Sequence, residues 1–359
     1  MPEPAQAQDG SVTFNVVFTP GSVELLLPFS LSLLQSPSVG VRLVGNACTP
    51  PEVELLRAAC GVDDRLSHHR LPGEEHPVEH GEALNHLFEA FPEPRFAFID
   101  SDVIASGDFM ASLWPPSPGS AAAFAAAAAS WVAEDEEIAD PRQTTLGGAK
   151  QALHDGTFIG NTFCAIYDRA AIEPAWRQAP RGFGAHHWHG IPRPVRDELE
   201  ARGWRYRTYD TGRLINLTLL LAGHRLERRA APELHHVGAL SNQRFRGWGG
   251  AARRLAAIRS RPDGRLRLLA HGVLNRLYFR FQRDPLRERR RERARIVRPY
   301  LNAALGAVRR GERPPEPPET DSPDVDRRLA ALVAALESEY PRAVSELREV
   351  VGAYQSGGT

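Results

Sequence analysis

The order of apolar and polar residues over the first hundred positions predicts short strands that alternate with helices. The predicted elements are strands at 13–19 and 39–45 and helices at 23–34, 51–60 and 81–91. The third helix has the clearest pattern, because Leu84, Leu87 and Phe88 fall on one face. Strands and helices in alternation at short spacing are typical of βαβ units. The sequence therefore predicts an α/β fold with a mostly parallel sheet.

Beyond residue 110 the pattern is looser. The apolar run 121–132 fits a strand or a buried helix equally well, because periodicity cannot separate them. The further predictions are a strand at 157–167 with an internal glycine, a loop at 182–194, a helix at 195–202, a strand at 204–209 and a helix at 214–221. All of these are expected to belong to one domain that ends near residue 245.

The last third of the chain changes to arginine-rich helical segments without strands. The expected organisation is a catalytic domain at 1–245, an arginine-rich helical extension at 246–310, a Pro-rich linker at 311–324 and a helical segment at 325–359. A break at Tyr340-Pro341 divides that last segment into two helices. The apolar stretch 266–281 is expected to be core or an oligomer contact, so the C-terminal helices are the expected surface for a homo-oligomer.

Composition narrows the class of protein. The 359 residues are 42% hydrophobic and 25% charged with a formal net charge of zero, which gives no global attraction to nucleic acid. Lys150 is the sole lysine, so composition bias accounts for much of the arginine in the run 287–298. This run is interpreted first as a solvated helix face, and a surface for nucleic acid or anionic lipid is the alternative. Three widely spaced cysteines, no basic-then-apolar leader and no apolar run of transmembrane length favour a cytoplasmic protein.

The segment that carries chemistry is the apolar run 95–99, which ends in Asp100-Ser101-Asp102. If the strand continues through these residues, both carboxylates point to the same side. The carboxyl end of a parallel strand is where open α/β sheets bind ligands. Paired carboxylates there suit Mg²⁺ or Mn²⁺ and a phosphate. A solvated acidic turn is the alternative for this tripeptide alone.

Three further segments support the metal interpretation: Gly81 to Asn85 opens the preceding helix, Gly107-Asp108-Phe109 follows the strand, and His236-Val237-Gly238 lies far downstream. In this order and spacing, residues 12–245 resemble the GT-A glycosyltransferases, and the part around the Asp-x-Asp strand is most similar to family 2. The resemblance implies a single Rossmann-like, mixed, mostly parallel sheet flanked by helices, followed here by the C-terminal helical extension.

The resemblance also implies roles in a metal-dependent donor site. Asp102 is the expected direct ligand of Mn²⁺ or Mg²⁺, Asp100 contacts the ribose or a metal-bound water, and His236 supplies a third ligand. His235 is its rival, because neighbours on an extended segment face opposite ways. The residues expected to bind the nucleotide are Phe18, Thr19, Pro20, Asn46, Asn85, Asp100 and Ser101.

The acceptor half departs from the family pattern, since no acidic pair precedes the helix at 195–202. Asp210, in a break after a strand, is the candidate catalytic base. The expected acceptor-binding residues are Asn161, His187, Trp188 and His189. The histidines lack the spacing of a closed zinc site.

The resemblance thus implies a glycosyltransferase that moves a sugar from a nucleotide-diphosphate donor to an unidentified saccharide or small-molecule acceptor. A nucleotidyltransferase could use the same Asp-x-Asp motif and divalent cation. Such an enzyme would normally have a Gly-rich, basic phosphate loop after the first strand, and residues 20–24 do not form one. A non-catalytic GT-A-like binding protein that docks through its arginine-rich helices is the other alternative.

Overall fold

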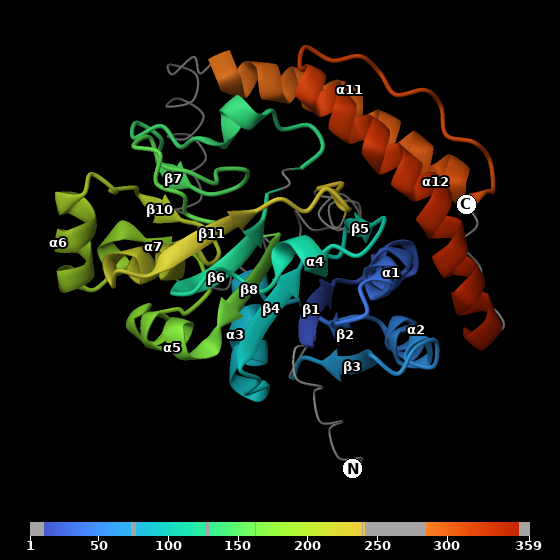
Figure 1. Ribbon diagram of the computed structural model, residues 1–359, viewed down its shortest axis with the longest axis horizontal. Helices are drawn as coiled ribbons and strands as arrows, with labels where there is room; N and C mark the ends of the chain where they lie inside the picture. The colour runs from blue at the N-terminus through green and yellow to red at the C-terminus, as the bar shows by residue number, and fades with distance from the viewer. Residues whose placement is uncertain are drawn as a thin grey trace, which may run out of the picture.

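The structure is a computed structural model that describes residues 11–72, 77–126, 129–161, 163–238, 240 and 285–351, with side chains from 288 onward in the last range. Within these ranges a central sheet has helices on both faces and two long helices along one side (Figure 1). The sequence interpretation of 266–281 and the proposed boundary at 245 lie outside the described residues.

The central sheet has seven strands in the order β11-β6-β8-β4-β1-β2-β3. Its strands are β1 Val12–Phe18, β2 Val39–Gly45, β3 Leu66–Arg70, β4 Arg95–Ile99, β6 Ser120–Ala125, β8 Cys164–Asp168 and β11 Arg225–Arg229. Strand β8 is antiparallel to β4 and β6, and the other neighbours are parallel. The predicted mixed, mostly parallel sheet is confirmed.

Strand order reverses between β1 and β4. From β1 the chain passes to β2 and β3 on one side, then returns to β4 on the other. Such a switch point leaves a crevice at the carboxyl ends of the two strands, where open α/β sheets bind ligands. The end of β4 leads directly into Asp100.

Two hydrophobic layers form the core, one on each face of the sheet. The helices are α1 Val23–Ser32, α2 Pro50–Ala59, α3 His80–Ala90, α4 Met110–Leu113, α5 Arg169–Gln178, α6 Arg193–Ala201 and α7 Arg213–Leu221. Alternate residues of β4 face opposite layers: Ala97 and Ile99 join the α1 and α2 side, and Phe96 and Phe98 join the α3 and α5 side. This is the period-2 alternation of a sheet buried on both faces.

Smaller strands lie beyond the main sheet. Strands β7 Thr145–Leu146, β10 Thr208–Tyr209 and β9 His186–His187 form one group, in that order. Strands β5 Val103–Ala105 and β12 Leu234–His236 form an antiparallel pair. Three single-turn 3₁₀ helices connect elements: η1 Leu33–Gln35, η2 Glu134–Glu137 and η3 Trp188–Gly190. Among the candidate site residues, these short elements carry His187, Trp188, His189 and His236.

The two C-terminal helices, α11 Pro285–Arg309 and α12 Pro323–Val351, run along the α1 and α2 side of the molecule (Figure 1). Their buried side chains belong to the same hydrophobic layer as α1 and β5. The predicted break at Tyr340-Pro341 is wrong, because α12 continues through Pro341. Tyr340 is buried and packs edge-on against Phe29, so tertiary packing outweighs the one backbone hydrogen bond that proline removes.

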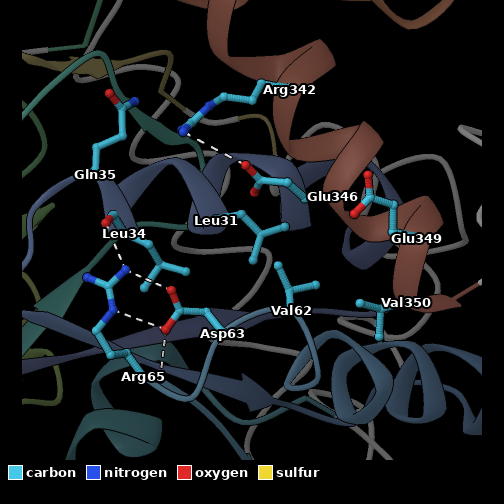
Figure 2. Close-up of a pocket in the computed structure, with 10 residues that line it drawn as sticks. All are labelled: Leu31, Leu34, Gln35, Val62, Asp63, Arg65, Arg342, Glu346, Glu349 and Val350. Carbon is cyan, nitrogen blue, oxygen red and sulfur yellow. Dashed lines mark hydrogen bonds and ion pairs between the residues drawn. The ribbon is translucent and has the colours of Figure 1, made fainter.

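A pocket of about 250 Å³ lies between the end of α12, η1 and the loop before β3 (Figure 2). Its arginines are paired within the pocket, Arg65 with Asp63 at 2.7 Å and Arg342 with Glu346 at 3.8 Å. Their charges are already compensated, so we assign this pocket no function.

Several elements differ from the sequence prediction. Strand β6 resolves the ambiguous run and ends at Ala125. The strand predicted at 157–167 begins only at Cys164, because Gly160 adopts a left-handed turn with φ +73° and a side chain there would meet Phe124 at 2.6 Å. Strands β3 and β11 were not predicted. Both lie at sheet edges and are largely polar, so they lack the apolar signal of a buried strand.

Candidate metal centre

Asp100, Ser101 and Asp102 form a tight turn between β4 and β5. The sequence prediction that the strand continues through them is therefore wrong. Ser101 and Asp102 are nevertheless buried, at 5% and 2% exposed, whereas the Asp100 side chain is 32% exposed. The Asp100 amide donates to the Phe163 carbonyl at 2.7 Å, which ties the turn to the segment before β8. The backbone of Asp100 is thus fixed against the segment before β8.

Strand β12 brings a histidine to this turn. Because it pairs antiparallel with β5, His236 lies opposite Val103, and His235 lies opposite Ile104 with its side chain on the other face. His235 Nε2 lies 2.9 Å from Ser106 Oγ, and burial lowers the pKa of His235 to about 4. His236 is therefore the one of the pair that faces the carboxylates.

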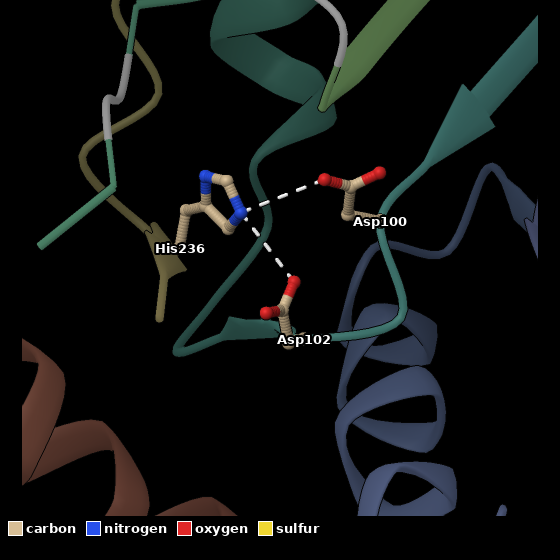
Figure 3. A group of neighbouring side chains, drawn as sticks. All are labelled: Asp100, Asp102 and His236. Atoms are coloured by element: carbon tan, nitrogen blue, oxygen red, sulfur yellow. Dashed lines mark ion pairs between the residues drawn. The ribbon is translucent and has the colours of Figure 1, made fainter. Parts of the chain in front are cut away.

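The side chains of Asp100, Asp102 and His236 converge on one point (Figure 3). His236 Nε2 lies 3.4 Å from Asp102 Oδ1 and 3.6 Å from Asp100 Oδ2. One ligand atom from each residue lies within 4.8 Å of the others. Ligands at right angles around an Mg²⁺-sized ion are about 3 Å apart, so the two distances from His236 Nε2 need only a small contraction.

Neighbouring groups fix the orientation of two of the three side chains. The Phe163 ring stacks on the His236 ring with centroids 4.6 Å apart. Asp102 Oδ2 accepts a hydrogen bond from the Leu240 amide at 2.9 Å, and the Asp102 carbonyl accepts one from the Val237 amide at 3.0 Å. Such support sets the direction in which a ligand atom points.

The electrostatics are those of a like-charge pair with one histidine. The pKa of Asp100 is raised to about 7: desolvation is the main cause, His236 opposes it, and the Asp102 charge adds to it. Burial alone would raise the pKa of Asp102 and lower that of His236. Their mutual attraction reverses both shifts, so the pKa of Asp102 is lowered and that of His236 is raised. A cation would relieve the repulsion between the carboxylates.

His236 supplies the best test of whether these residues fit a metal ion. Neither of its buried ring nitrogens has a hydrogen-bond partner among the described residues. A buried polar atom without a partner is costly and rare. Two carboxylate oxygens and one imidazole nitrogen are a donor set suited to Mn²⁺, and also to Mg²⁺ completed by water. The residues present therefore fit a divalent cation.

The nucleotide-binding candidates at the first two strands lie at the expected edge. Phe18 ends β1 and is fully buried, and Thr19 and Pro20 follow it. Thr19 Oγ1 is buried and has no hydrogen-bond partner among the described residues. Asn46 is engaged instead, because its amide exchanges two 3.0 Å hydrogen bonds with the Val78 backbone. Thr19 thus has a free polar atom at this edge, and Asn46 does not.

Asn85 organises a neighbouring loop. Its Nδ2 donates to the Arg181 carbonyl at 2.9 Å, and its Oδ1 accepts from Trp176 Nε1 and the Phe183 amide, each at 2.8 Å. The structure gives Asn85 a connecting role between α3 and the segment after α5.

The acceptor-binding candidates are divided between buried and exposed positions. Asn161 is 3% exposed, and its side chain bonds to the backbone of Ala125, Phe163 and Cys164. Trp188 is 6% exposed and stacks on Tyr209, so its ring is covered by protein. His187 and His189 are the exposed members of the group.

Asp210 follows β10 and belongs to a cluster that the sequence did not reveal. Its carboxylate accepts from the Gly148 amide at 3.4 Å, and a side chain at Gly147 would meet its Cβ at 2.5 Å. Fully buried Arg213 bonds to the carbonyls of Gly160 and Gly148. Burial lowers the pKa of His80 to about 4, with Asp210 as a weaker opposing influence.

Arg213 lies three residues after Asp210, and its amide donates to the Asp210 carbonyl at 3.0 Å, but no motif marks it. His80 is distant in sequence, and only the fold places it near Asp210. His236, in contrast, was marked in the sequence by the motif His236-Val237-Gly238. Trp131 and Ser130, which contact the segment that carries His236, were also missed because they are distant in sequence.

No protein-family model and no curated protein matches the chain. Among solved structures, the mannosyltransferase PcManGT from Pyrobaculum calidifontis, in complex with GDP-Man and Mn²⁺, is 13% identical over 96% of this chain and 76% of its own, with a TM-score of 0.36. An active-site mutant of LgtC is 11% identical over 60% and 72%, with a TM-score of 0.35. A glucose-1-phosphate thymidylyltransferase from Bacillus anthracis, described as putative, is 14% identical over 66% and 94%, with a TM-score of 0.34.

At TM-scores below 0.5 these likenesses carry no argument about function. Within the described residues, no helix has both the length and the apolar character needed to span a membrane.

Proposed function

We propose that the protein is a metal-dependent glycosyltransferase that transfers a sugar from a nucleotide-diphosphate donor to an acceptor hydroxyl. The observation that carries the proposal is the convergence of Asp100, Asp102 and His236 beside the switch point of the sheet. That position is where an α/β sheet binds nucleotides, and the donor set suits the cation that accompanies a pyrophosphate. The order of motifs resembling GT-A glycosyltransferases adds to it.

The proposed division of labour follows the chemistry of donor cleavage. A bound Mn²⁺ or Mg²⁺ would neutralise charge on the departing diphosphate. Asp102 and His236, whose orientations are fixed by Leu240 and Phe163, would hold it, and Asp100 would complete the set or contact the ribose. Thr19, with its unpartnered hydroxyl, is the proposed contact at the end of β1.

For the acceptor half we propose Asp210 as the general base. A carboxylate suits this role, because an inverting transfer needs a base within hydrogen-bond reach of the acceptor hydroxyl. Exposed His187 and His189 are the proposed acceptor contacts. The enclosed ring of Trp188 makes it a support for that loop rather than a platform for a sugar.

The test is a donor panel. Wild-type protein is incubated with UDP-, GDP- and TDP-sugars, with and without Mn²⁺, and products are followed by mass spectrometry. We expect metal-dependent hydrolysis or transfer with one donor class, lost in Asp102→Asn and retained in Asp64→Asn, which changes an exposed carboxylate. Full activity of Asp102→Asn would refute the assigned site.

A nucleotidyltransferase is the enzymatic rival, and the same protein can test it. That reaction joins a nucleoside triphosphate to a sugar 1-phosphate and releases pyrophosphate. Residues 20–24, which follow β1, contain no basic side chain to neutralise a triphosphate. We therefore expect no metal-dependent pyrophosphate release, and its appearance would replace the transfer proposal. The absence of any nucleotide binding would favour a non-catalytic protein that docks through its arginine-rich helices.

A further inference from the structure

Residues 129–137 lie between the strand that carries His236 and the two C-terminal helices. On the strand side, the Ser130 amide donates to the His236 carbonyl at 3.1 Å, and Ser130 Oγ donates to the Val237 carbonyl at 3.0 Å. These hydrogen bonds add to the pairing of β12 with β5. The backbone position of His236 therefore depends on where Ser130 is held.

The packing between this segment and the strand leaves no space. Gly238 has φ +85°, and a Cβ there would lie 2.7 Å from Ala129 Cβ and 2.8 Å from Trp131 Cη2. Trp131 is 6% exposed, and the Arg298 guanidinium of α11 lies 4.5 Å from its ring centre. A shift of Trp131 would thus be passed directly to the residues that follow His236.

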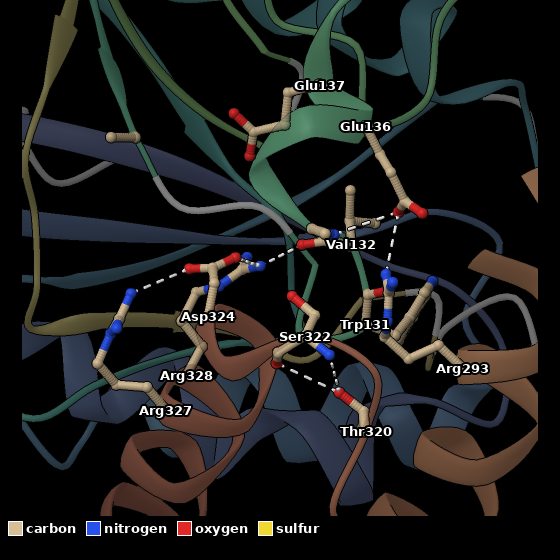
Figure 4. A network of polar contacts seen from close by, with 12 residues as sticks. Trp131, Val132, Glu136, Glu137, Arg293, Thr320, Ser322, Asp324, Arg327 and Arg328 are labelled. Atoms are coloured by element: carbon tan, nitrogen blue, oxygen red, sulfur yellow. Dashed lines mark hydrogen bonds and ion pairs between the residues drawn. The ribbon is translucent and has the colours of Figure 1, made fainter. Parts of the chain in front are cut away.

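Arg293 of α11 fixes the same segment from the helix side (Figure 4). It is 4% exposed, and its Nη1 lies 3.2 Å from both the Trp131 carbonyl and a carboxylate oxygen of Glu136, which is 2% exposed. Its Nε donates to Asp321 at 2.7 Å. Glu136 also accepts from the Ala133 amide, so this buried ion pair closes the turn at η2.

Helix α12 holds the next residue of this segment, Val132, in a similar way. Arg328 donates to the Val132 carbonyl and pairs with Asp324 at 2.7 Å. The carbonyls of Trp131 and Val132 therefore each accept from an arginine of a C-terminal helix. A buried guanidinium that bonds to a backbone carbonyl fixes the position of that carbonyl more tightly than apolar packing alone.

We propose that Arg293 is a positioning residue: through Trp131 and Ser130 it sets the place of His236, so that the C-terminal helices determine the affinity of the metal centre. This inference rests on the proposed function, because it concerns the same site. It assigns the arginine-rich helix a purpose other than binding an external partner. Arg293 has no contact with the metal-binding side chains and acts only through the segment between.

The experiment measures Mn²⁺ affinity by calorimetry on the full chain. Arg293→Met removes the guanidinium and keeps a long side chain, and Glu136→Gln accompanies it in a double variant so that no buried carboxylate is left unpaired. Arg295→Met is the matched control, since Arg295 lies on the exposed face of the same helix with 76% of its side chain accessible.

We expect Mn²⁺ affinity to fall about tenfold in the double variant, as for other residues that support a metal ligand indirectly. Nucleotide binding without metal and the near-ultraviolet circular dichroism should stay as in the wild type, which separates positioning from general loss of structure. The Arg295→Met control should keep full affinity.

If the double variant fails to fold, Arg293→Lys carries the test, because an ammonium group keeps the charge and cannot reach all three partners. A folded variant with Mn²⁺ affinity within twofold of the wild type would overturn the inference. Failure of the wild type itself to bind Mn²⁺ would instead contradict the proposed function, so the two failures are distinguishable.

Discussion

A single strand position decides which histidine reaches the candidate metal centre. His235 and His236 are adjacent and alike in sequence, yet the pairing of β12 with β5 turns them to opposite faces. His235 Nε2 lies beside Ser106, whereas the ring nitrogens of His236 have no hydrogen-bond partner among the described residues and its Nε2 faces the two carboxylates. The two residues therefore make a matched pair for mutagenesis.

We expect His236→Ala to reduce Mn²⁺ affinity more than about a hundredfold, because loss of a direct ligand costs more than loss of an indirect support, which costs about 10–100-fold. His235→Ala should bind Mn²⁺ as the wild type does. Both are measured by calorimetry or by manganese paramagnetic resonance. Equal loss in the two variants would show that histidine substitution disrupts β12 in general, and an unaffected His236→Ala would remove this residue from the site.

A positive φ and the close approach of Ala129 and Trp131 explain why position 238 is a glycine. Gly238→Ala should cost about 1–3 kcal/mol of unfolding free energy from its positive φ, and more from the collision with Ala129 and Trp131. Gly223→Ala is the control, since Gly223 has φ +82° with nothing within 4 Å of an added Cβ. Urea denaturation measures the difference. Both variants should lose stability, and only Gly238→Ala should also lose Mn²⁺ affinity; equal losses of stability would contradict the steric argument.

At the scale of elements, packing outweighs local propensity in helix α12. The helix passes through Pro341, whose ring is exposed and contributes little packing. We expect Pro341→Ala to stabilise the protein by about 2 kcal/mol, because proline in a helix interior costs about 3 kcal/mol and its rigidity in the unfolded chain returns up to about 1 kcal/mol. Pro323→Ala should be near neutral, since proline is tolerated in the first helical turn.

Chemical denaturation of both proline variants measures this difference. A midpoint for Pro341→Ala that does not exceed that of Pro323→Ala would show that the Pro341 ring makes favourable contacts of its own.

Glu137, in the 3₁₀ turn η2, makes the stability of the protein depend on pH. Desolvation raises the pKa of Glu137 to about 7 from an ordinary 4.5, although Arg228 of β11 and Arg328 of α12 oppose the shift and Glu134 and Asp324 add to it. Because the native state holds this proton more tightly than the unfolded chain, the resulting stability is present below pH 4.5 and is lost as pH rises through 7.

Glu137→Gln should therefore stabilise the protein at pH 8 relative to wild type and change little at pH 5. Melting temperatures of the two proteins over this range measure the effect, since other titrating groups cancel in the difference. A difference that does not change with pH would contradict the raised pKa of Glu137.

At the scale of the whole molecule, the sequence predicted what depends on local pattern. Strands β1 and β2, helices α1 to α3 and the approach to Asp100 follow from apolar periodicity, and all lie within a residue or two of their predicted places. The nature of the sheet followed from the alternation of these elements. The Asp-x-Asp spacing and the resemblance of His236-Val237-Gly238 to a family motif pointed to the three residues that the fold brings together, with His235 left as a rival to His236.

What the sequence could not predict depends on contacts between distant segments. Edge strands such as β11 are stabilised by pairing rather than by an apolar pattern. Trp188 was predicted to bind the acceptor, but the Tyr209 ring stacks against it in the structure. The burial of Arg293 could not be predicted, because the residue lies in a run of charged residues that are mostly exposed. Its partner Glu136 is distant in sequence and is brought to it only by the fold.

The metal centre should also control the stability of the molecule as a whole. A ligand that binds only the native state stabilises it by RT ln(1 + [L]/Kd), about 2.7 kcal/mol at a hundredfold excess over Kd. At pH 8, above the pKa of about 7 for Asp100, two carboxylates of like charge face each other without a cation. We expect Asp100→Asn to melt higher than wild type in EDTA, because it removes this repulsion.

In Mn²⁺ the order should reverse, with a large upward shift in wild type and a small one in Asp100→Asn. Thermal melts of both proteins, with EDTA and with a Mn²⁺ series, give all four values. Asp64→Asn, which alters an exposed carboxylate elsewhere, should behave as wild type in both conditions. A wild type that melts at the same temperature with and without Mn²⁺ would show that the repulsion at Asp100 and Asp102 serves some purpose other than holding this ion.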